Sequence, residues 1–231
     1  MKPFKFKQFE ILQSKEVFRV GTDGVLLGAF ADVDDAQNVL EVGTGTGLIS
    51  LMLAQRNNKA QFCGLDIQEA AFSLTKNNFE NSPFADRMEA NLVDFKSFES
   101  KYTFDLIVSN PPYFEESTSN KDKIARQTVE LNFEQLISKS ASLLSDKGLF
   151  SVIIPAEIGE SFIAIAKANL LFLNRKINIF GIENSKVKRL ILEFTLNETQ
   201  VQELEFIIEK SPRQYSDAYI ELTKEFHIFK S

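Results

Sequence analysis

The chain has 231 residues, of which 44% are hydrophobic and 25% charged, with 26 Lys and Arg against 32 Asp and Glu and a formal net charge of −6. These fractions exclude a disordered chain, a collagen-like repeat and a coiled coil, and the length suits one large domain of roughly 200–250 residues. The overall acidity argues against a uniformly basic nucleic-acid binder.

Strand-like and helix-like segments alternate along the chain from residue 38 onward. Before this alternation, the apolar stretch 25–31 predicts a short helix with Thr22 or Asp23 as its N-cap. Apolar runs predict strands over 39–42, 61–66, 87–91, 104–109, 149–154, 176–182, 189–195 and 204–208. Helical spacing of apolar residues predicts helices over 48–56, 68–79, 133–144, 156–169 and within 215–229.

Strands that alternate with helices of about ten residues are typical of βαβ units. We therefore predict an α/β, Rossmann-like fold, with a mostly parallel seven-stranded sheet and helices on both of its faces. The sequence contains no repeat, low-complexity stretch or clear linker. We expect residues 1–35 to form an N-terminal extension that closes over a bound ligand, and residues 36–231 to form the main domain.

A glycine-rich loop, the stretch 41–47 (EVGTGTG), joins the first strand of the alternation to the next helix. Glycines at the carboxyl end of a strand let the backbone turn sharply and approach a ligand closely. The G-x-G-x-G spacing differs from the dinucleotide fingerprint G-x-G-x-x-G, and the Lys-Ser/Thr ending of a P-loop is missing. The loop therefore favours a ligand other than a dinucleotide or a nucleoside triphosphate.

Two acidic residues accompany this loop. Glu41 lies two residues before Gly43, and Asp66 ends the next predicted strand. A carboxylate beside the loop would repel a pyrophosphate, whereas it suits S-adenosylmethionine, which carries an ammonium and a sulfonium group. Asp66 could accept hydrogen bonds from ribose hydroxyls, or it could simply cap the following helix. The pair favours S-adenosylmethionine over a dinucleotide.

The sequence Asn110-Pro111-Pro112-Tyr113 follows the strong strand 104–109. The two prolines end the strand and fix the backbone where open α/β sheets bind their ligands. The side-chain oxygen of Asn110 and the carbonyl of Pro111 could accept the two hydrogens of a planar –NH₂ group, and Tyr113 could stack on the attached ring. The alternative is a plain turn in which Tyr113 packs at the rim.

The chain contains one cysteine, Cys63, and one histidine, His227. These numbers exclude an internal disulfide framework and a Cys/His zinc site. We expect His227 to pack or lie at the surface rather than serve in a Ser-His-Asp triad. The longest apolar stretch falls far short of the about 20 residues that a membrane helix needs. We therefore expect a cytoplasmic protein without a metal or a membrane partner.

Together, the Glu-x-Gly-x-Gly-x-Gly loop, Asp66 and Asn-Pro-Pro-Tyr resemble the motifs of class I S-adenosylmethionine-dependent methyltransferases that methylate amino groups. Further stretches are similar to the bacterial tRNA1(Val) (adenine(37)-N6)-methyltransferase family, and this similarity spans nearly the whole chain. These stretches are 6–9, 20–28, 51–56, 126–131 and 215–219. The resemblance implies in-line transfer of a methyl group from S-adenosylmethionine to N6 of the adenosine 3′ of the anticodon.

The resemblance also implies roles for individual residues. Thr22 and Asp23 would hold the methionine end of the cofactor, and an acidic position near the end of the third strand, here Asn91 or Asp94, would contact its adenine. The predicted cofactor-binding set is Thr22, Asp23, Glu41, Gly43, Thr44, Gly45, Gly47, Asp66, Ile67, Asn91 and Asn110. The predicted catalytic set is Asn110, Pro111, Pro112 and Tyr113.

Binding of tRNA needs positive charge, which this acidic chain concentrates in short segments. Residues 1–19 carry five basic against two acidic residues, and residues 167–189 carry six against one. The residues predicted to contact RNA are Lys5, Lys7, Lys121, Lys123, Arg126, Lys186, Lys188 and Arg189. Phe4 and Phe6, which alternate with lysines, could stack on bases or be buried. We expect the protein to act as a monomer.

Three alternatives remain. A release-factor glutamine methyltransferase shares the Asn-Pro-Pro-Tyr logic but has a substantial helical domain before the glycine loop, whereas only 40 residues precede Glu41 here. An rRNA guanine-N2 methyltransferase is the second alternative. A catalytically inactive RNA-binding factor is the third, and it would bind S-adenosylmethionine without transferring the methyl group.

Overall fold

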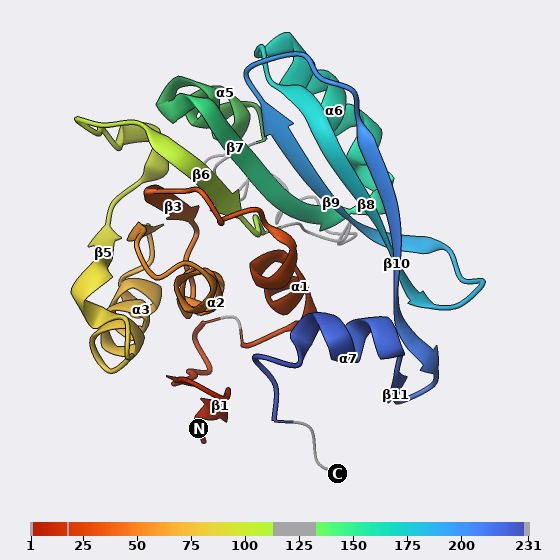
Figure 1. Ribbon diagram of the computed structural model, residues 1–231. Coiled ribbons are helices and arrows are strands. Elements are labelled where there is room, and N and C mark those ends of the chain that lie inside the picture. The colour runs from red at the N-terminus through yellow and green to blue at the C-terminus, as the bar shows by residue number, and fades with distance from the viewer. Residues whose placement is uncertain (1, 18, 113–132, 229–231) are drawn as a thin grey trace, which may run out of the picture.

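A single mixed sheet is the centre of the fold in the computed structural model, which describes residues 2–17, 19–112 and 133–228 (Figure 1). Nine strands of these described residues form the sheet. They are β3 (Asn38–Val42), β4 (Gln61–Asp66), β5 (Met88–Leu92), β6 (Phe104–Ser109), β7 (Leu144–Pro155), β8 (Phe172–Ile182), β9 (Val187–Thr195), β10 (Gln202–Ser211) and β11 (Gln214–Tyr215).

The spatial order of the strands is β11-β10-β8-β9-β7-β6-β3-β4-β5. Strands β3 to β7 are mutually parallel, β10 is parallel to β8, and β9 is antiparallel to both β7 and β8. The predicted α/β class with a mostly parallel sheet is confirmed. The predicted number of seven strands is wrong, because β10 pairs with β8 along its length and β11 then pairs with β10.

Helices cover both faces of the sheet (Figure 1). One face carries α1 (Thr22–Phe30), α2 (Leu48–Arg56), α3 (Glu69–Glu80) and α7 (Asp217–Thr223), and the other carries α5 (Phe133–Leu143) and α6 (Gly159–Ala168). The short 3₁₀ helices are η1 (Ala85–Arg87), η2 (Phe95–Ser97) and η3 (Ala156–Ile158). Side chains of β6 alternate between the layers: Leu106 and Val108 join the α1–α2 core, and Ile107 joins the α5–α6 core. No described helix has the length and apolar content that crossing a membrane requires.

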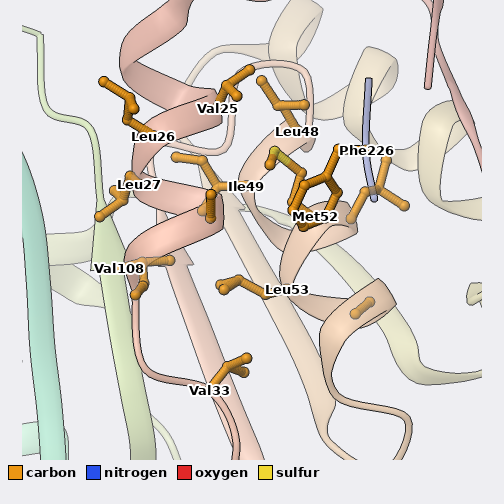
Figure 2. Close-up of a cluster of buried hydrophobic side chains, with 14 of the residues drawn as sticks. Val25, Leu26, Leu27, Val33, Leu48, Ile49, Met52, Leu53, Val108 and Phe226 are labelled. Carbon is orange, nitrogen blue, oxygen red and sulfur yellow. The ribbon is translucent and has the colours of Figure 1, made fainter. Parts of the chain in front are cut away.

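Helix α1 is buried along most of its length, which its sequence explains. Residues 24–29 are all buried, so this helix is apolar around its whole circumference. A Cβ at Gly24 would lie 3.1 Å from the Leu48 side chain, and one at Gly28 would lie 2.9 Å from Met52. The two glycines thus let α1 pack closely against α2, as the shared cluster in Figure 2 shows. The contacts place the start of α1 beside the start of α2.

The two ends of the chain meet in an aromatic cluster. Strands β1 (Phe4–Lys5) and β2 (Glu10–Ile11) pair with each other, and Phe6 forms an antiparallel bridge with His227. The rings of Phe6 and His227 stack with centroids 5.4 Å apart, and Phe6 is only 3% exposed. Burial lowers the pKa of His227. The predicted packing role of His227 is confirmed, and the burial alternative is correct for Phe6.

Several predicted element boundaries are wrong. Gly21, in extended conformation, is the N-cap of α1, so Thr22 and Asp23 lie in its first turn instead of capping it. The helix predicted within 215–229 is restricted to α7, because Tyr215 belongs to β11 and Ser216 caps the helix through the amide of Tyr219. The helix predicted from residue 156 begins as η3 and becomes α6 only at Gly159.

Candidate active site

Sheet register brings the predicted motifs together at one edge. Val42 pairs with Leu65 on one side and with Ser109 on the other, and Asp66 pairs with Leu92. The segments that follow β3, β4, β5 and β6 therefore leave the sheet side by side at their carboxyl ends. This is the edge at which open α/β sheets bind ligands. The hydroxyl of Ser109 also donates to the Val42 carbonyl at 2.9 Å, which ties the ends of β3 and β6 together.

The glycine loop depends on backbone conformations that other residues rarely adopt. Gly43, Gly45 and Gly47 have φ angles of 75°, 58° and 77°. A Cβ at Gly47 would also lie 2.6 Å from the ring of Phe79 on α3, so this position excludes any side chain. A Cβ at Gly43 would meet nothing within 4 Å, which means that its backbone faces open space. The loop thus packs tightly at Gly47 and presents exposed backbone at Gly43.

Hydrogen bonds from β4 and α3 hold the loop in place. Oδ2 of Asp66 accepts from the amide of Gly45 at 2.9 Å, and Oδ1 accepts from the amide of Gln68 at 2.9 Å. The Thr44 hydroxyl donates to the Leu65 carbonyl at 2.8 Å. The Thr75 hydroxyl donates to the Gly45 carbonyl at 2.9 Å. Asp66 therefore orients the loop and the turn before α3, while its carboxylate sits at the ligand edge.

Glu41 is almost completely buried beneath the loop, with 1% of its surface exposed. Its Oε2 accepts hydrogen bonds from both the backbone amide and the hydroxyl of Ser50 on α2. Burial raises the pKa of Glu41 to about 8, against the opposing effect of the Ser50 hydrogen bonds; the charge of Asp66 raises it further. A cation bound next to Glu41 would favour its ionised form.

Residues of the N-terminal segment lie against the glycine loop. Asn78 on α3, itself buried, exchanges two hydrogen bonds with the backbone of Leu12 and donates to the carbonyl of Thr46 at 2.8 Å. A Cβ on Gly45 would lie 3.9 Å from the side chain of the buried Val17. Residues 12–17 therefore lie against the loop.

Thr22 and Asp23 reach the same edge through α1. Gly24 lies against Leu48, the first residue of α2 after the glycine loop, so the first turn of α1 lies next to that loop. The Oδ2 atom of Asp23 lies 2.9 Å from Nε of Arg189, at the start of β9. The structure thus brings a predicted cofactor residue and a predicted RNA residue into one ion pair.

Asn110 and Pro111 directly follow β6, next to the end of β3. Asn110 is half-buried, Pro111 is buried and Pro112 is exposed. The predicted amino-group acceptors, Asn110 and Pro111, thus lie one and two residues beyond Ser109, which binds Val42. Tyr113 lies outside the described residues.

Apolar and polar side chains flank this edge on β4 and β5. Ile67 is 54% exposed and Leu92 is 48% exposed. The Asn91 amide lies 3.5 Å from the sulfur of Cys63, and Asp94 accepts from the amide of Lys96 as the N-cap of η2. Ile67 and Leu92 offer an apolar surface for a planar ring, with Asn91 and Asp94 nearby.

The predicted RNA residues that the structure describes lie in two separate regions of the chain. Lys186 and Lys188 are exposed at the β8–β9 turn, whereas Arg189 pairs with Asp23. Lys5 lies in the β1–β2 pair and forms an ion pair with Glu10 at 2.8 Å. Lys7 is exposed in the same N-terminal region. The remaining predicted contacts, Lys121, Lys123 and Arg126, lie outside the described residues.

Four residues that support the site are absent from the predicted sets. Ser50 binds Glu41, Asn78 links the N-terminal segment to the loop, Ser109 ties β6 to β3, and Leu92 extends the exposed apolar surface. The sequence carries no spacing signal for Asn78, whose partners Leu12 and Thr46 lie 66 and 32 residues away along the chain. Leu92 directly follows Asn91, where the predicted strand 87–91 ends. Its exposure could have been anticipated from this position at the ligand-binding end of the strand. Within the described part of the chain, no group of three or more His, Cys, Asp or Glu side chains could hold a metal ion.

Solved structures and a family model define the class of this fold. A predicted O-methyltransferase from Agrobacterium tumefaciens matches 88% of this chain and 96% of its own, with a TM-score of 0.68 and 16% identity. A methyltransferase from Pyrococcus furiosus matches 82% and 89%, with a TM-score of 0.62 and 18% identity. The family model "Methyltransferase small domain" matches residues 8–173. The fold is that of a class I methyltransferase, and the chain belongs to the family of this model.

Curated relatives narrow the family further. A tRNA1(Val) (adenine(37)-N6)-methyltransferase from Flavobacteriaceae bacterium (strain 3519-10) is 52% identical over the full length of both chains. A protein of the same name from Phocaeicola vulgatus is 45% identical over 97% of each chain, and one from Actinobacillus pleuropneumoniae is 34% identical over 97%. The chain belongs to the tRNA1(Val) (adenine(37)-N6)-methyltransferase family.

Proposed function

We propose that this chain transfers a methyl group from S-adenosylmethionine to N6 of adenine 37 in tRNA1(Val). The observation that carries the proposal is the 52% identity over the full chain to a relative with that activity in its name. The geometry adds independent support, because glycine loop, acidic residues and amino-group acceptors meet at one sheet edge.

The residues at this edge fit S-adenosylmethionine. The open space beside Gly43 allows the amino acid end of the cofactor to approach the backbone. A carboxylate has about four acceptor sites, so Asp66 can accept ribose hydroxyls in addition to the two amides that it already binds. The exposed side chains of Ile67 and Leu92 suit the adenine ring. S-adenosylmethionine supplies an electrophilic methyl group on its sulfonium when bound.

Asn110 and Pro111 would orient the target amino group. An amide oxygen and a backbone carbonyl accept the two hydrogens of the exocyclic –NH₂, and this directs the nitrogen lone pair toward the methyl donor. Such orientation accounts for most of the rate in a direct transfer, and the proton can leave afterwards. His227 packs in the aromatic cluster at the chain ends, remote from β6 in the sequence and in its contacts. Stacking of Tyr113 on the adenine stays a prediction.

Adenine 37 lies in the anticodon loop, where an unpaired base can be turned out of its stack and enter a protein site. The exposed Lys186, in the turn after β8, and Lys188, at the start of β9, lie on the same edge of the sheet as Asn110. We infer that these lysines contact the RNA backbone, with Lys7 as a second candidate. We also expect the enzyme to act in the cytoplasm, where tRNA is present, and to act as a monomer.

The alternative functions fit the comparisons less well. A glutamine methyltransferase would also use Asn110 and Pro111, but the full-length relatives carry tRNA adenine in their names. Nucleoside mass analysis of tRNA from cells that lack the gene tests the proposal. Loss of N6-methyladenosine from tRNA1(Val), restored by the intact gene, is expected. Unchanged N6-methyladenosine in that tRNA would contradict the proposed substrate.

A further inference from the structure

The ion pair between Asp23 and Arg189 connects two parts of the chain for which different ligands are predicted, the cofactor for Asp23 and RNA for Arg189. Asp23 lies in the first turn of α1, and Arg189 lies opposite Pro155 at the start of β9. Nε of Arg189 is 2.9 Å from Oδ2 of Asp23, and the two side chains are 33% and 26% exposed. The pair is therefore partly shielded from water, where a charge-assisted hydrogen bond of good geometry matters more than on an open surface.

The opposite end of α1 is anchored separately. Nη1 of Arg56 donates to the carbonyls of Gly28 and Ala31, and Nη2 of Arg175 donates to the carbonyl of Phe30 at 2.6 Å. Packing against α2 holds the middle of the helix (Figure 2). Loss of the Asp23 pair should therefore loosen the first turn without unfolding the helix.

We propose that Arg189 is a positioning residue for cofactor binding. It holds the first turn of α1, with Thr22 and Asp23, against the glycine-loop edge through its ion pair. This inference rests on the proposed function, because it requires S-adenosylmethionine at that edge. It replaces the predicted direct contact of Arg189 with RNA. It also connects the cofactor segment to the β8–β9 turn, where Lys186 and Lys188 are exposed.

A double-mutant cycle on S-adenosylmethionine binding tests the proposal without any tRNA. Calorimetric dissociation constants are measured for the full-length protein and for Asp23→Asn, Arg189→Ala and the double variant. Each single substitution is expected to raise the dissociation constant by about 5-fold, and the double variant by about the same factor. Independent roles would instead multiply to about 25-fold in the double variant, and this result would overturn the proposal.

Lys176→Ala provides a matched control. Lys176 forms an ion pair with Glu203 at 2.8 Å, on the β8–β10 strands but away from α1. Its removal is expected to leave the dissociation constant of S-adenosylmethionine unchanged. An effect of Lys176→Ala equal to that of Arg189→Ala would mean that any lost surface pair weakens the site, and this would contradict a specific positioning role.

Two further measurements separate positioning from general destabilisation. Amide hydrogen exchange of residues 22–25 in the ligand-free protein should accelerate in Arg189→Ala, while exchange in β3 stays unchanged. Arg189→Lys, which keeps the charge, should bind S-adenosylmethionine within about 2-fold of the unsubstituted protein. Arg189→Lys binding as weakly as Arg189→Ala would contradict the proposal.

Binding of tRNA in the absence of cofactor completes the test. Arg189→Ala is expected to keep its tRNA affinity within about 2-fold. Lost tRNA affinity together with an unchanged dissociation constant for S-adenosylmethionine would restore the RNA-contact role and overturn the inference. If the unsubstituted protein failed to bind S-adenosylmethionine at all, the proposed function itself would fail.

Discussion

The two halves of the sheet are stabilised in different ways. In the loop half, strands β3 to β6, the key contacts are hydrogen bonds of the backbone and of short polar side chains, such as Thr44 to Leu65 and Ser109 to Val42. In the C-terminal half, strands β8 to β11, pairs of opposite charge recur, as between Lys176 and Glu203.

This difference agrees with the ligand that we propose for each half. The loop half presents glycine backbone and a few acidic groups, which suits one small cationic cofactor held in a fixed position. The C-terminal half presents exposed lysines on a strand turn, which suits the distributed negative charge of an RNA backbone. The ion pair between Arg189 and Asp23 links β9 of the C-terminal half to the first turn of α1, next to the glycine loop.

The largest expected effect is on catalysis in the loop half. Asn110→Ala removes one acceptor of the amino group and should lower kcat by about 100-fold or more, because the lone pair of the target nitrogen is no longer aligned. Calorimetry should show the dissociation constant of S-adenosylmethionine within about 3-fold of the original value. Asn81→Ala, an exposed amide at the end of α3, is the control. Full activity of Asn110→Ala would refute its role.

A glycine in each half offers the next contrast. Gly47→Ala combines a φ of 77° with a contact of 2.6 Å to Phe79, and should lower the free energy of unfolding by about 3 kcal/mol. A Cβ at Gly181 on β8 would meet only the flexible end of Lys188, at 3.4 Å. Gly181→Ala should therefore change the free energy of unfolding by less than about 0.5 kcal/mol. Urea denaturation measures both. Equal effects would show that the loop is not under special steric constraint.

The buried Glu41 predicts a dependence of stability on pH. Its pKa in the folded protein, about 8, exceeds the ordinary value of 4.5, so the folded state retains a proton that the unfolded state releases. The free energy of unfolding should therefore fall as pH rises from 4.5 to 8, and Glu41→Gln should reduce that fall by about 2 kcal/mol. Urea midpoints across this range measure the effect, with the exposed Glu157→Gln as control. Identical pH profiles for Glu41→Gln and the original protein would contradict it.

The smallest expected effect belongs to the C-terminal half. Replacing both Lys186 and Lys188 by Ala should weaken tRNA binding about 10-fold at low salt, and should reduce the salt dependence of the affinity by about two counterions. The dissociation constant of S-adenosylmethionine should stay unchanged. The control replaces Lys59 and Lys147, two exposed lysines elsewhere on the protein, by Ala and so changes the net charge by the same amount. Equal losses in both double variants would show a general effect of net charge.

Sequence patterns revealed the loop half better than the C-terminal half. The apolar strand 104–109 and the glycine loop 41–47 are each one unbroken stretch of sequence. Local periodicity and spacing therefore predicted the structure of each and their meeting at one edge of the sheet. In β8, the strand begins at Phe172, earlier than the predicted residue 176, because its backbone already pairs with β9 there and Arg175 forms an ion pair with Glu193 on that strand. In the sequence alone, charged residues at the start of a strand are typical of a loop.

Long-range pairs account for the remaining differences. Asp23 and Arg189 are 166 residues apart, and no local pattern shows that they meet. The same holds for Asn78, which binds Leu12 from 66 residues away. The N-cap prediction for α1 was wrong because an extended Gly21 starts the helix, and the polar residues after it lie in the first turn.

The central claim is methyl transfer to N6 of adenine 37 in tRNA1(Val). The most direct test incubates the purified protein with S-adenosylmethionine and an unmodified tRNA1(Val) transcript, then maps the methylated nucleoside by mass analysis of nuclease fragments. The expected result is N6-methyladenosine at position 37. It should be absent when Asn110→Ala replaces the original protein, and also when adenine 37 is changed to another base. A methyl group on another nucleoside, or no methylation of this transcript, would contradict the account.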